Sequence, residues 1–242
     1  MEMVILIYNG SCFDLEREIE GWNIDVVLMN PPYNATRKTM NKSYVDTWSD
    51  KVKTDPSKGL YFVDWIAKRV KKGKLAVLLP MACAIGSSKK IKQLKKSLLN
   101  ENTLDAVFSL PSEVFYPGAS VQACCMIFTL GKRHHESYET FFGYYKDDGF
   151  KKKKNLGRVE AIDINGHGVW TAIEAKWLDL YRNKKIVPGL SAVRHVNSND
   201  EWLAEAYMET DYTSLLEADF QRSINDYLSY LVKIGEVKDD RC

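Results

Sequence analysis

Residues 25–34 constrain the fold of this chain more than any other stretch. The apolar run at residues 26–29 stops abruptly at residues 30–33, which read Asn-Pro-Pro-Tyr. A short, continuous apolar run that ends at a turn signal predicts a buried strand of a parallel sheet. Open α/β sheets bind their ligands at the carboxyl ends of such strands. We therefore expect a binding site at this turn.

The turn offers hydrogen-bond acceptors beside an aromatic face. Pro31 and Pro32 have no backbone N–H group, so the carbonyl groups around them have few local donors. Asn30 adds a side-chain carbonyl, and Tyr33 adds a flat, weakly polar ring. Two neighbouring acceptors and a ring suit a planar base that carries an amino group, such as adenine. The same residue types also terminate strands without any further role.

The Asn-Pro-Pro-Tyr turn resembles that of the amino-group DNA methyltransferases, and specifically the methylation subunits of type I restriction-modification systems. The resemblance implies that Asn30, Pro31, Pro32 and Tyr33 receive a target adenine. It further implies transfer of a methyl group from S-adenosylmethionine to the adenine N6.

A second block of the chain has the same resemblance. A strand pattern at residues 104–110 is followed by Val-Phe-Tyr-Pro-Gly-Ala at residues 114–119. The resemblance implies that Phe115 packs against a flipped adenine on a side that Tyr33 does not cover. Judged by its neighbours alone, Phe115 also fits a core position.

The cofactor residues follow from a weaker resemblance. Residues 10–13, Gly-Ser-Cys-Phe, are similar to the family turn that lies against the adenine of S-adenosylmethionine, with Ser11 in place of the usual Asp or Asn. This implies that Ser11, Cys12 and Phe13 contact the cofactor, together with Asn30 and Phe62. Locally, residues 10–13 equally fit a plain strand-ending turn, and Phe62 fits a core residue.

Strand and helix patterns alternate over the first 145 residues. We expect strands at residues 3–8, 25–29, 75–79, 104–110, 121–130 and 141–145, and helices at residues 60–70, 89–100, 170–181, 200–207 and 213–231. With the resemblance, this predicts an α/β fold: the C-terminal half of a Rossmann-like class I methyltransferase sheet, followed by a mainly helical tail. We place a partial catalytic domain at residues 1–147 and the tail at residues 148–242.

An intact enzyme of this family has a glycine-rich turn and an acidic residue before the first of these strands. No Gly-x-Gly pattern precedes Asn30. We therefore expect a truncated or split form with an unpaired sheet edge. Either the first strand rearranges, or a partner such as a complementary N-terminal methyltransferase fragment completes the sheet. The resemblance also implies DNA and the specificity and restriction subunits as partners.

Two basic stretches leave alternatives open. Residues 34–59 interleave lysines and Arg37 with Tyr44 and Trp48, which fits either a DNA-binding loop or a solvated loop whose aromatic rings pack inward. The four lysines at residues 151–154 fit either phosphate contacts or an exposed charge run.

Composition excludes several classes of protein. The chain is 45 % hydrophobic, but no apolar run reaches the roughly 18 residues of a membrane span, and its start lacks signal-peptide features. We expect a cytoplasmic protein without a membrane partner. Five cysteines without a C-x-x-C pair predict neither a metal site nor disulfides. The net charge of +2 leaves nucleic-acid binding open.

Three functions are therefore compatible with the sequence. The first is a site-specific DNA adenine-N6 methyltransferase of the restriction-modification type. The second is a catalytically inactive remnant that binds DNA or the other restriction-modification subunits. The third is a methyltransferase that acts on RNA or on protein glutamine, because related turns serve those amino groups as well.

Overall fold

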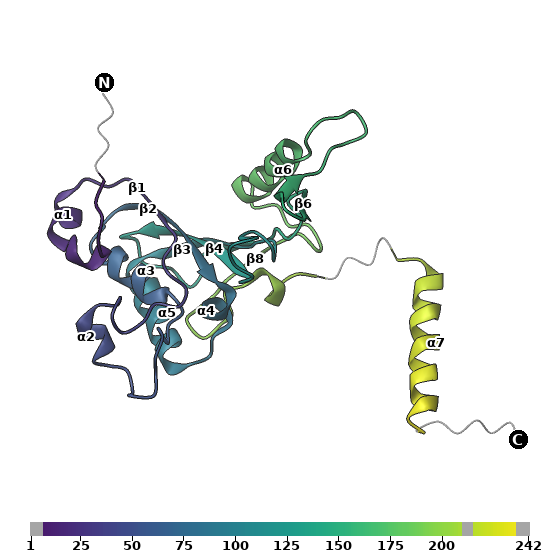
Figure 1. Ribbon diagram of the computed structural model, residues 1–242, viewed down its shortest axis with the longest axis horizontal. Helices are drawn as coiled ribbons and strands as arrows, with labels where there is room; N and C mark the ends of the chain where they lie inside the picture. Colours follow the sequence, from purple (N-terminus) through teal and green to yellow (C-terminus); the bar gives the residue numbers. More distant parts are fainter. Residues whose placement is uncertain (1–6, 210–214, 236–242) are drawn as a thin grey trace, which may run out of the picture. The chain divides into compact units, whose positions relative to one another are not determined.

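The computed structural model describes residues 7–209 and 215–235. Contacts divide the chain into one compact unit that ends at Met208 and a second that begins at Glu209. The strands are β1 (Val26–Met29), β2 (Gly73–Pro80), β3 (Thr103–Ser109), β4 (Ala123–Leu130), β5 (Thr140–Tyr144), β6 (Phe150–Lys153), β7 (Gly157–Glu160) and β8 (Ser191–Arg194). Six of them form a mixed sheet in the order β1-β2-β4-β3-β5-β8, and β6 and β7 form a separate hairpin (Figure 1).

The helices are α1 (Glu16–Gly21), α2 (Lys42–Val45), α3 (Leu60–Ala67), α4 (Met81–Ile85), α5 (Lys89–Glu101), α6 (Trp170–Arg182) and α7 (Glu217–Lys233), with 3₁₀ turns η1 (Cys12–Asp14) and η2 (Ala204–Ala206). None of the helices described is both long enough and apolar enough to span a bilayer.

One face of the sheet carries the main core. Helices α3 and α5 pack their apolar faces there against alternate residues of β2 and β4, because successive strand residues point to opposite faces. The α5 helix begins where the Ser88 hydroxyl accepts a hydrogen bond from the Ile91 N–H at 3.3 Å. On the opposite face, α6 covers β3 and β5 through Leu180 and its aromatic residues. These two layers confirm the predicted α/β class.

Strand β1 differs from its prediction in one respect. It pairs in parallel with β2, Met29 opposite Val77, as expected for residues 25–29. The predicted burial is wrong: Leu28 is 80 % exposed and Val26 59 % exposed. The reason is that β1 lies at the edge of the sheet, on the side that α6 does not reach, so these apolar side chains face solvent among the described residues.

The segment after residue 147 contributes to the same sheet and core. Strand β8 pairs with β5, Ala192 opposite Phe142, and Trp202 is fully buried. The compact unit thus continues to Met208, where the sequence suggested a separate tail from residue 148.

The expected helices of this segment have mixed outcomes. Helix α6 confirms the one at residues 170–181, and α7 agrees with the last one, whose start at Thr213 lies outside the described residues. The prediction of a helix at residues 200–207 is wrong, since only the 3₁₀ turn η2 forms there. The indole of Trp202 donates to the Asn197 carbonyl at 2.9 Å, which holds this segment in a turn. Of the strand expected at residues 3–8, residues 3–6 lie outside the described residues, and Ile7 and Tyr8 are not in a strand.

Lys95 is a buried cation in this core. Its side chain is 1 % exposed and donates to the carbonyl groups of Ala84 at 2.5 Å and Asp200 at 3.0 Å. The ammonium also lies 4.9 Å from the ring centre of Trp202. Burial lowers the pKa of Lys95 to about 8, because the apolar surroundings disfavour the charged form.

Lys95 therefore makes stability depend on pH. Above about pH 8 the folded chain releases this proton, whereas the unfolded chain keeps it up to about pH 10.5. The unfolded state binds more protons in this window, so stability rises with pH. We expect the free energy of unfolding of the wild type, relative to Lys95→Met, to increase by roughly 2–3 kcal/mol from about pH 7 to 10.5 in urea titrations. Lys96→Met, at an exposed position of the same helix, should show no such trend. A flat or falling difference for Lys95→Met would contradict the prediction.

Candidate functional site

The Asn-Pro-Pro-Tyr turn forms one wall of an open cavity of about 450 Å³ at the carboxyl end of β1. The opposite wall comes from the loop between β3 and β4. The Tyr33 and Phe115 rings meet edge to face, with centres 5.8 Å apart and planes at 75°. The cavity is lined by Asn30, Pro31, Pro32, Tyr33, Asn34, Phe115, Gly118, Ala119 and Val121. The structure thus brings together the two blocks that the sequence analysis assigned to base binding.

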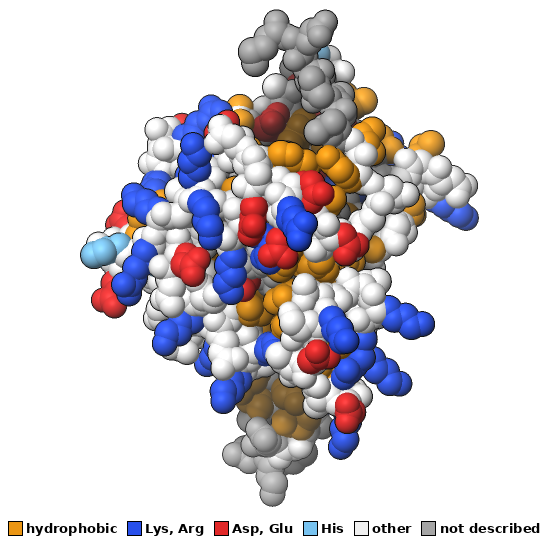
Figure 2. All heavy atoms as spheres, turned by 90° about the vertical axis from the view of Figure 1, so that its left-hand side faces the viewer, with side chains coloured by type: hydrophobic (Ala, Val, Ile, Leu, Met, Phe, Trp, Pro, Cys, Tyr) orange, Lys and Arg blue, Asp and Glu red, His pale blue; other side chains and the backbone are white. Residues whose placement is uncertain are grey.

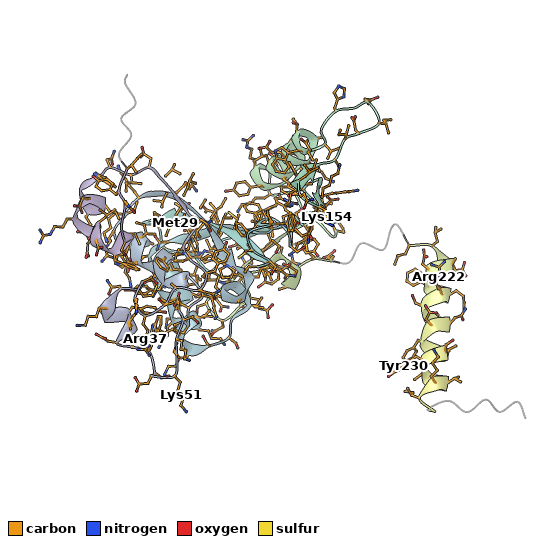
Figure 3. The ribbon with its side chains drawn as sticks, in the orientation of Figure 1. Met29, Arg37, Lys51, Lys154, Arg222 and Tyr230 are labelled. Carbon is orange, nitrogen blue, oxygen red and sulfur yellow. The ribbon has the colours of Figure 1, made fainter. Side chains whose placement is uncertain are left out.

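Acceptor groups at this cavity are free to bind a ligand. Asn30 is exposed, and its side-chain amide makes no hydrogen bond to any described residue. The same holds for the Pro31 carbonyl within the described ranges. Strand β1 ends at Met29 (labelled in Figure 3), so the two acceptors lie directly after a paired strand that fixes their position.

Tyr33 presents its ring to this cavity and hides its hydroxyl group. The hydroxyl is buried and has no hydrogen-bond partner among the described residues. Burial, with a smaller contribution from the nearby thiols of Cys124 and Cys83, raises the pKa of Tyr33 to about 12. The phenol therefore stays neutral at physiological pH, and the ring that lines the cavity is uncharged.

A second cavity, of about 640 Å³, adjoins the same turn. Ser11, Cys12, Phe13 and Phe62 all line it, so the four residues that resemble cofactor contacts share one hollow. The Phe13 and Phe62 rings are stacked, with centres 5.2 Å apart. Asn30 does not line this cavity, but Pro32 lines both cavities. The two cavities are therefore neighbours, and Pro32 of the turn forms part of the wall of each.

The residues of η1 have defined local roles. The Ser11 hydroxyl accepts a hydrogen bond from the Phe13 N–H at 3.3 Å and caps the turn. Burial raises the pKa of the Cys12 thiol, which therefore stays protonated.

Sequence reasoning missed several residues of the second cavity: Asp14 and the segment from Lys38 to Lys42. Asp14 directly follows the recognised turn, so its proximity was a usable signal. The other segment is reached only through tertiary packing, and no local pattern marked it.

The long loop at residues 34–59 is held by internal bonds. The Asp55 carboxylate is buried and accepts from the Tyr44 hydroxyl at 2.9 Å and the Gly59 N–H at 2.8 Å. The Arg37 guanidinium donates to the Val52 and Ser49 carbonyl groups at 2.9 and 2.5 Å. Tyr44 and Trp48 are buried, so of the two interpretations the inward-packed aromatic rings are correct.

Most lysines of this loop stay exposed, and only Lys58 is half-buried. Lys51 and Lys53 are among the exposed ones, and Lys51 is labelled in Figure 3. On the face that carries α1 and α2, Figure 2 shows Lys and Arg side chains spread over the surface, with Asp and Glu side chains between them. Within the described ranges, no group of three or more His, Cys, Asp or Glu side chains is arranged to hold a metal ion.

Comparison with known proteins places this arrangement in a family. The family described as N-6 DNA methylase matches residues 3–201. The chain belongs to the N-6 DNA methylase family. This confirms the resemblance that the turn and the Phe115 block indicated.

The chain is similar in sequence or in structure to proteins of restriction-modification systems. The chain is 26 % identical over 230 residues to the type II restriction enzyme and methyltransferase RM.BcgI of Heyndrickxia coagulans, covering 93 % of this chain. It spans about a third, 32 %, of that relative's length. The methyltransferase subunit of a type I restriction-modification system from Streptococcus thermophilus matches 71 % of this chain and 34 % of its own, at 24 % identity and a TM-score of 0.50.

A second solved structure covers more of the chain. A chain from a type I restriction-modification system, solved in a study of complex assembly and conformational transition, matches 94 % of this chain and 47 % of its own. The identity is 16 % and the TM-score 0.51. At these identities the two structures show the fold alone, and they confirm the predicted class I methyltransferase sheet. The roles of individual residues stay predictions.

Proposed function

We propose that this chain is the adenine-binding part of a site-specific DNA adenine-N6 methyltransferase of the restriction-modification type. The observation that carries the proposal is the position of the Asn-Pro-Pro-Tyr turn between two cavities, with Pro32 in the wall of each. A transfer enzyme must hold its donor and its acceptor in adjoining sites, because reacting atoms must approach to about 3–3.5 Å.

The cavity beside Tyr33 and Phe115 is proposed to hold an adenine flipped out of the duplex. Unstacking a base costs a few kcal/mol. Stacking on an aromatic ring recovers about 1–3 kcal/mol, and the neutral Tyr33 ring offers that surface. The Asn30 side chain and the Pro31 carbonyl then accept hydrogen bonds from the adenine amino group. These two bonds orient the nitrogen lone pair toward the second cavity and raise the electron density on it.

The second cavity has the properties of an S-adenosylmethionine site. Its volume, about 640 Å³, lies within the roughly 300–1,000 Å³ of ligand pockets. The stacked rings of Phe13 and Phe62 offer an apolar wall for an adenine, and the Asp14 carboxylate in the lining offers an acceptor for hydroxyl groups. When bound, S-adenosylmethionine supplies an electrophilic methyl group. The contribution of the chain would be to position the acceptor, because the turn would hold the accepting nitrogen beside the second cavity.

An inactive remnant is a second candidate that one observation favours. Among the described residues, Gly10 is the one glycine that lines the second cavity. The glycine-rich turn that the sequence analysis expected of an intact enzyme is therefore not among the described walls. Among residues 7–209 and 215–235, no strand pairs with the free edge of β1, and an apolar hollow of about 350 Å³ lies beside Leu28, Ala76 and Leu78. An N-terminal methyltransferase segment that pairs with β1 and covers this hollow would complete the site. Specificity and restriction subunits are the further partners that we propose.

Titration calorimetry and a transfer assay test the proposal. We expect the full chain to bind S-adenosylmethionine and to transfer its labelled methyl group to duplex DNA rather than to RNA or protein. Binding of S-adenosylmethionine without transfer to DNA would contradict the proposed acceptor. If neither binding nor transfer is detected, the remnant is the better description. Labelling of RNA or of protein glutamine would show that the substrate is RNA or protein instead of DNA.

A further inference from the structure

The β6–β7 hairpin has no role in the site described above, although its composition is unusual. Its two strands pair from Phe150 opposite Glu160 to Lys153 opposite Gly157. The turn between them is closed by the Leu156 N–H, which donates to the Lys153 carbonyl at 3.2 Å. Asn155 and Gly157 have positive φ angles of 64° and 80°, which the turn requires. Leu156 is 71 % exposed at the tip.

The base of the hairpin is rigidly held. The guanidinium of Arg158 forms two parallel hydrogen bonds to the Asp148 carboxylate, at 2.6 and 2.7 Å. Such a planar, bidentate pair fixes orientation as well as position. The Phe150 ring packs edge to face on Trp170, with centres 6.1 Å apart. The exposed tip therefore projects from a fixed base.

One lysine attaches the hairpin to the loop that carries Phe115. The Lys152 ammonium lies 3.5 Å from a carboxylate oxygen of Glu113 and 4.3 Å from the ring centre of Tyr116. These two residues flank Phe115, which lines the proposed base cavity. The hairpin is thus a direct neighbour of the place where a flipped base would enter.

The other three lysines are directed elsewhere. Side chains alternate along a strand, so Lys151 and Lys153 lie on the face of β6 opposite Lys152, and Lys154 begins the turn (labelled in Figure 3). All three are exposed, and among the described residues none has an acidic partner within 4.0 Å. Cations without an acidic partner can bind DNA phosphates, and this binding releases the counterions that were condensed on the DNA.

From these contacts we infer that the β6–β7 hairpin is a DNA clamp whose lysines hold the phosphate backbone and whose Leu156 enters the base stack beside the extruded nucleotide. An apolar side chain at the tip of a basic element can wedge between base steps and fill the space that a displaced base leaves. The inference rests on the proposed function, because it takes duplex DNA as the substrate.

Fluorescence anisotropy with the full chain tests the inference. The two probes are a labelled duplex and the same duplex with one central abasic site, which lowers the cost of opening the stack. We expect the wild type to bind the abasic duplex about tenfold more tightly. Leu156→Ala should reduce that preference to about twofold or less and leave affinity for the intact duplex within about twofold. Ile164→Ala removes a fully exposed apolar side chain from another loop and should leave the preference unchanged.

The lysines have a different signature. Replacing Lys153 and Lys154 together by alanine should weaken both probes alike and lower the slope of log affinity against log salt by about 1.8, or about 0.9 for each phosphate contact. An unchanged preference in Leu156→Ala, or an unchanged salt slope in the lysine variant, overturns the clamp while the proposed function stands. If the wild type binds neither duplex at low salt, the DNA substrate fails and the clamp fails with it.

Discussion

Replacing Asn30 by alanine is expected to abolish methyl transfer almost completely, by about 10²–10³-fold, without unfolding the chain. In the proposed function, the variant removes one of the two acceptors for the adenine amino group, and we expect that the Pro31 carbonyl alone does not fix the nitrogen. Stability should change by less than about 0.5 kcal/mol, because the Asn30 side chain is exposed and makes no hydrogen bond to a described residue. The readouts are labelled-methyl transfer under conditions in which the wild type is active, and thermal unfolding.

Asn23→Ala is the matched control for this experiment. It makes the same substitution at an exposed asparagine before β1 and away from both cavities, so transfer should equal that of the wild type. Methyl transfer at the wild-type rate by Asn30→Ala would contradict the assignment of the turn as the acceptor site. A large loss of stability in Asn30→Ala would instead show that the side chain serves the fold.

The site was predictable from sequence where one local stretch carries both its structure and its chemistry. An apolar run that stops at Asn-Pro-Pro-Tyr specifies a strand, its end and a pair of free acceptors at once. The place of Phe115 beside Tyr33 was predicted only through the family resemblance, because its neighbours alone also fit a core position. The wall formed by residues 38–42 was not predictable, because the internal bonds of Asp55 decide where that loop lies.

The burial of β1 was misjudged for a related reason. An apolar run predicts burial only if both neighbouring strands and both helical layers are present. In the described structure β1 has one neighbour, β2, and α6 packs on β3 and β5 without reaching β1. The apolar sequence of a strand shows which side chains can be buried, but the neighbouring strands and helices decide which of them are buried.

The last part of the sheet was hidden by weak local signals. Strand β8 has four residues, and the segment around Trp202 is turn-like, so neither stands out as part of a core. Their contribution comes from contacts distant in sequence: Trp202 lies 6.3 Å from Phe128 of β4, ring centre to ring centre, and Lys95 of α5 faces it. This makes the segment after β8 a structural element of the compact unit that ends at Met208.

Trp202→Ala should therefore lower the free energy of unfolding of this unit by about 3–5 kcal/mol. The side chain is fully buried, so alanine leaves a large cavity and removes the ring that faces the Lys95 ammonium. Urea unfolding followed by circular dichroism measures the loss. Trp22→Ala removes a tryptophan that is 41 % exposed and should cost less than about 1 kcal/mol. If Trp202→Ala does not fold, Trp202→Phe retains part of the ring and should give a smaller, measurable loss. A stability within about 1 kcal/mol of the wild type for Trp202→Ala would show that the sheet stands without this segment, and the boundary expected at residue 148 would then be the better division of the chain.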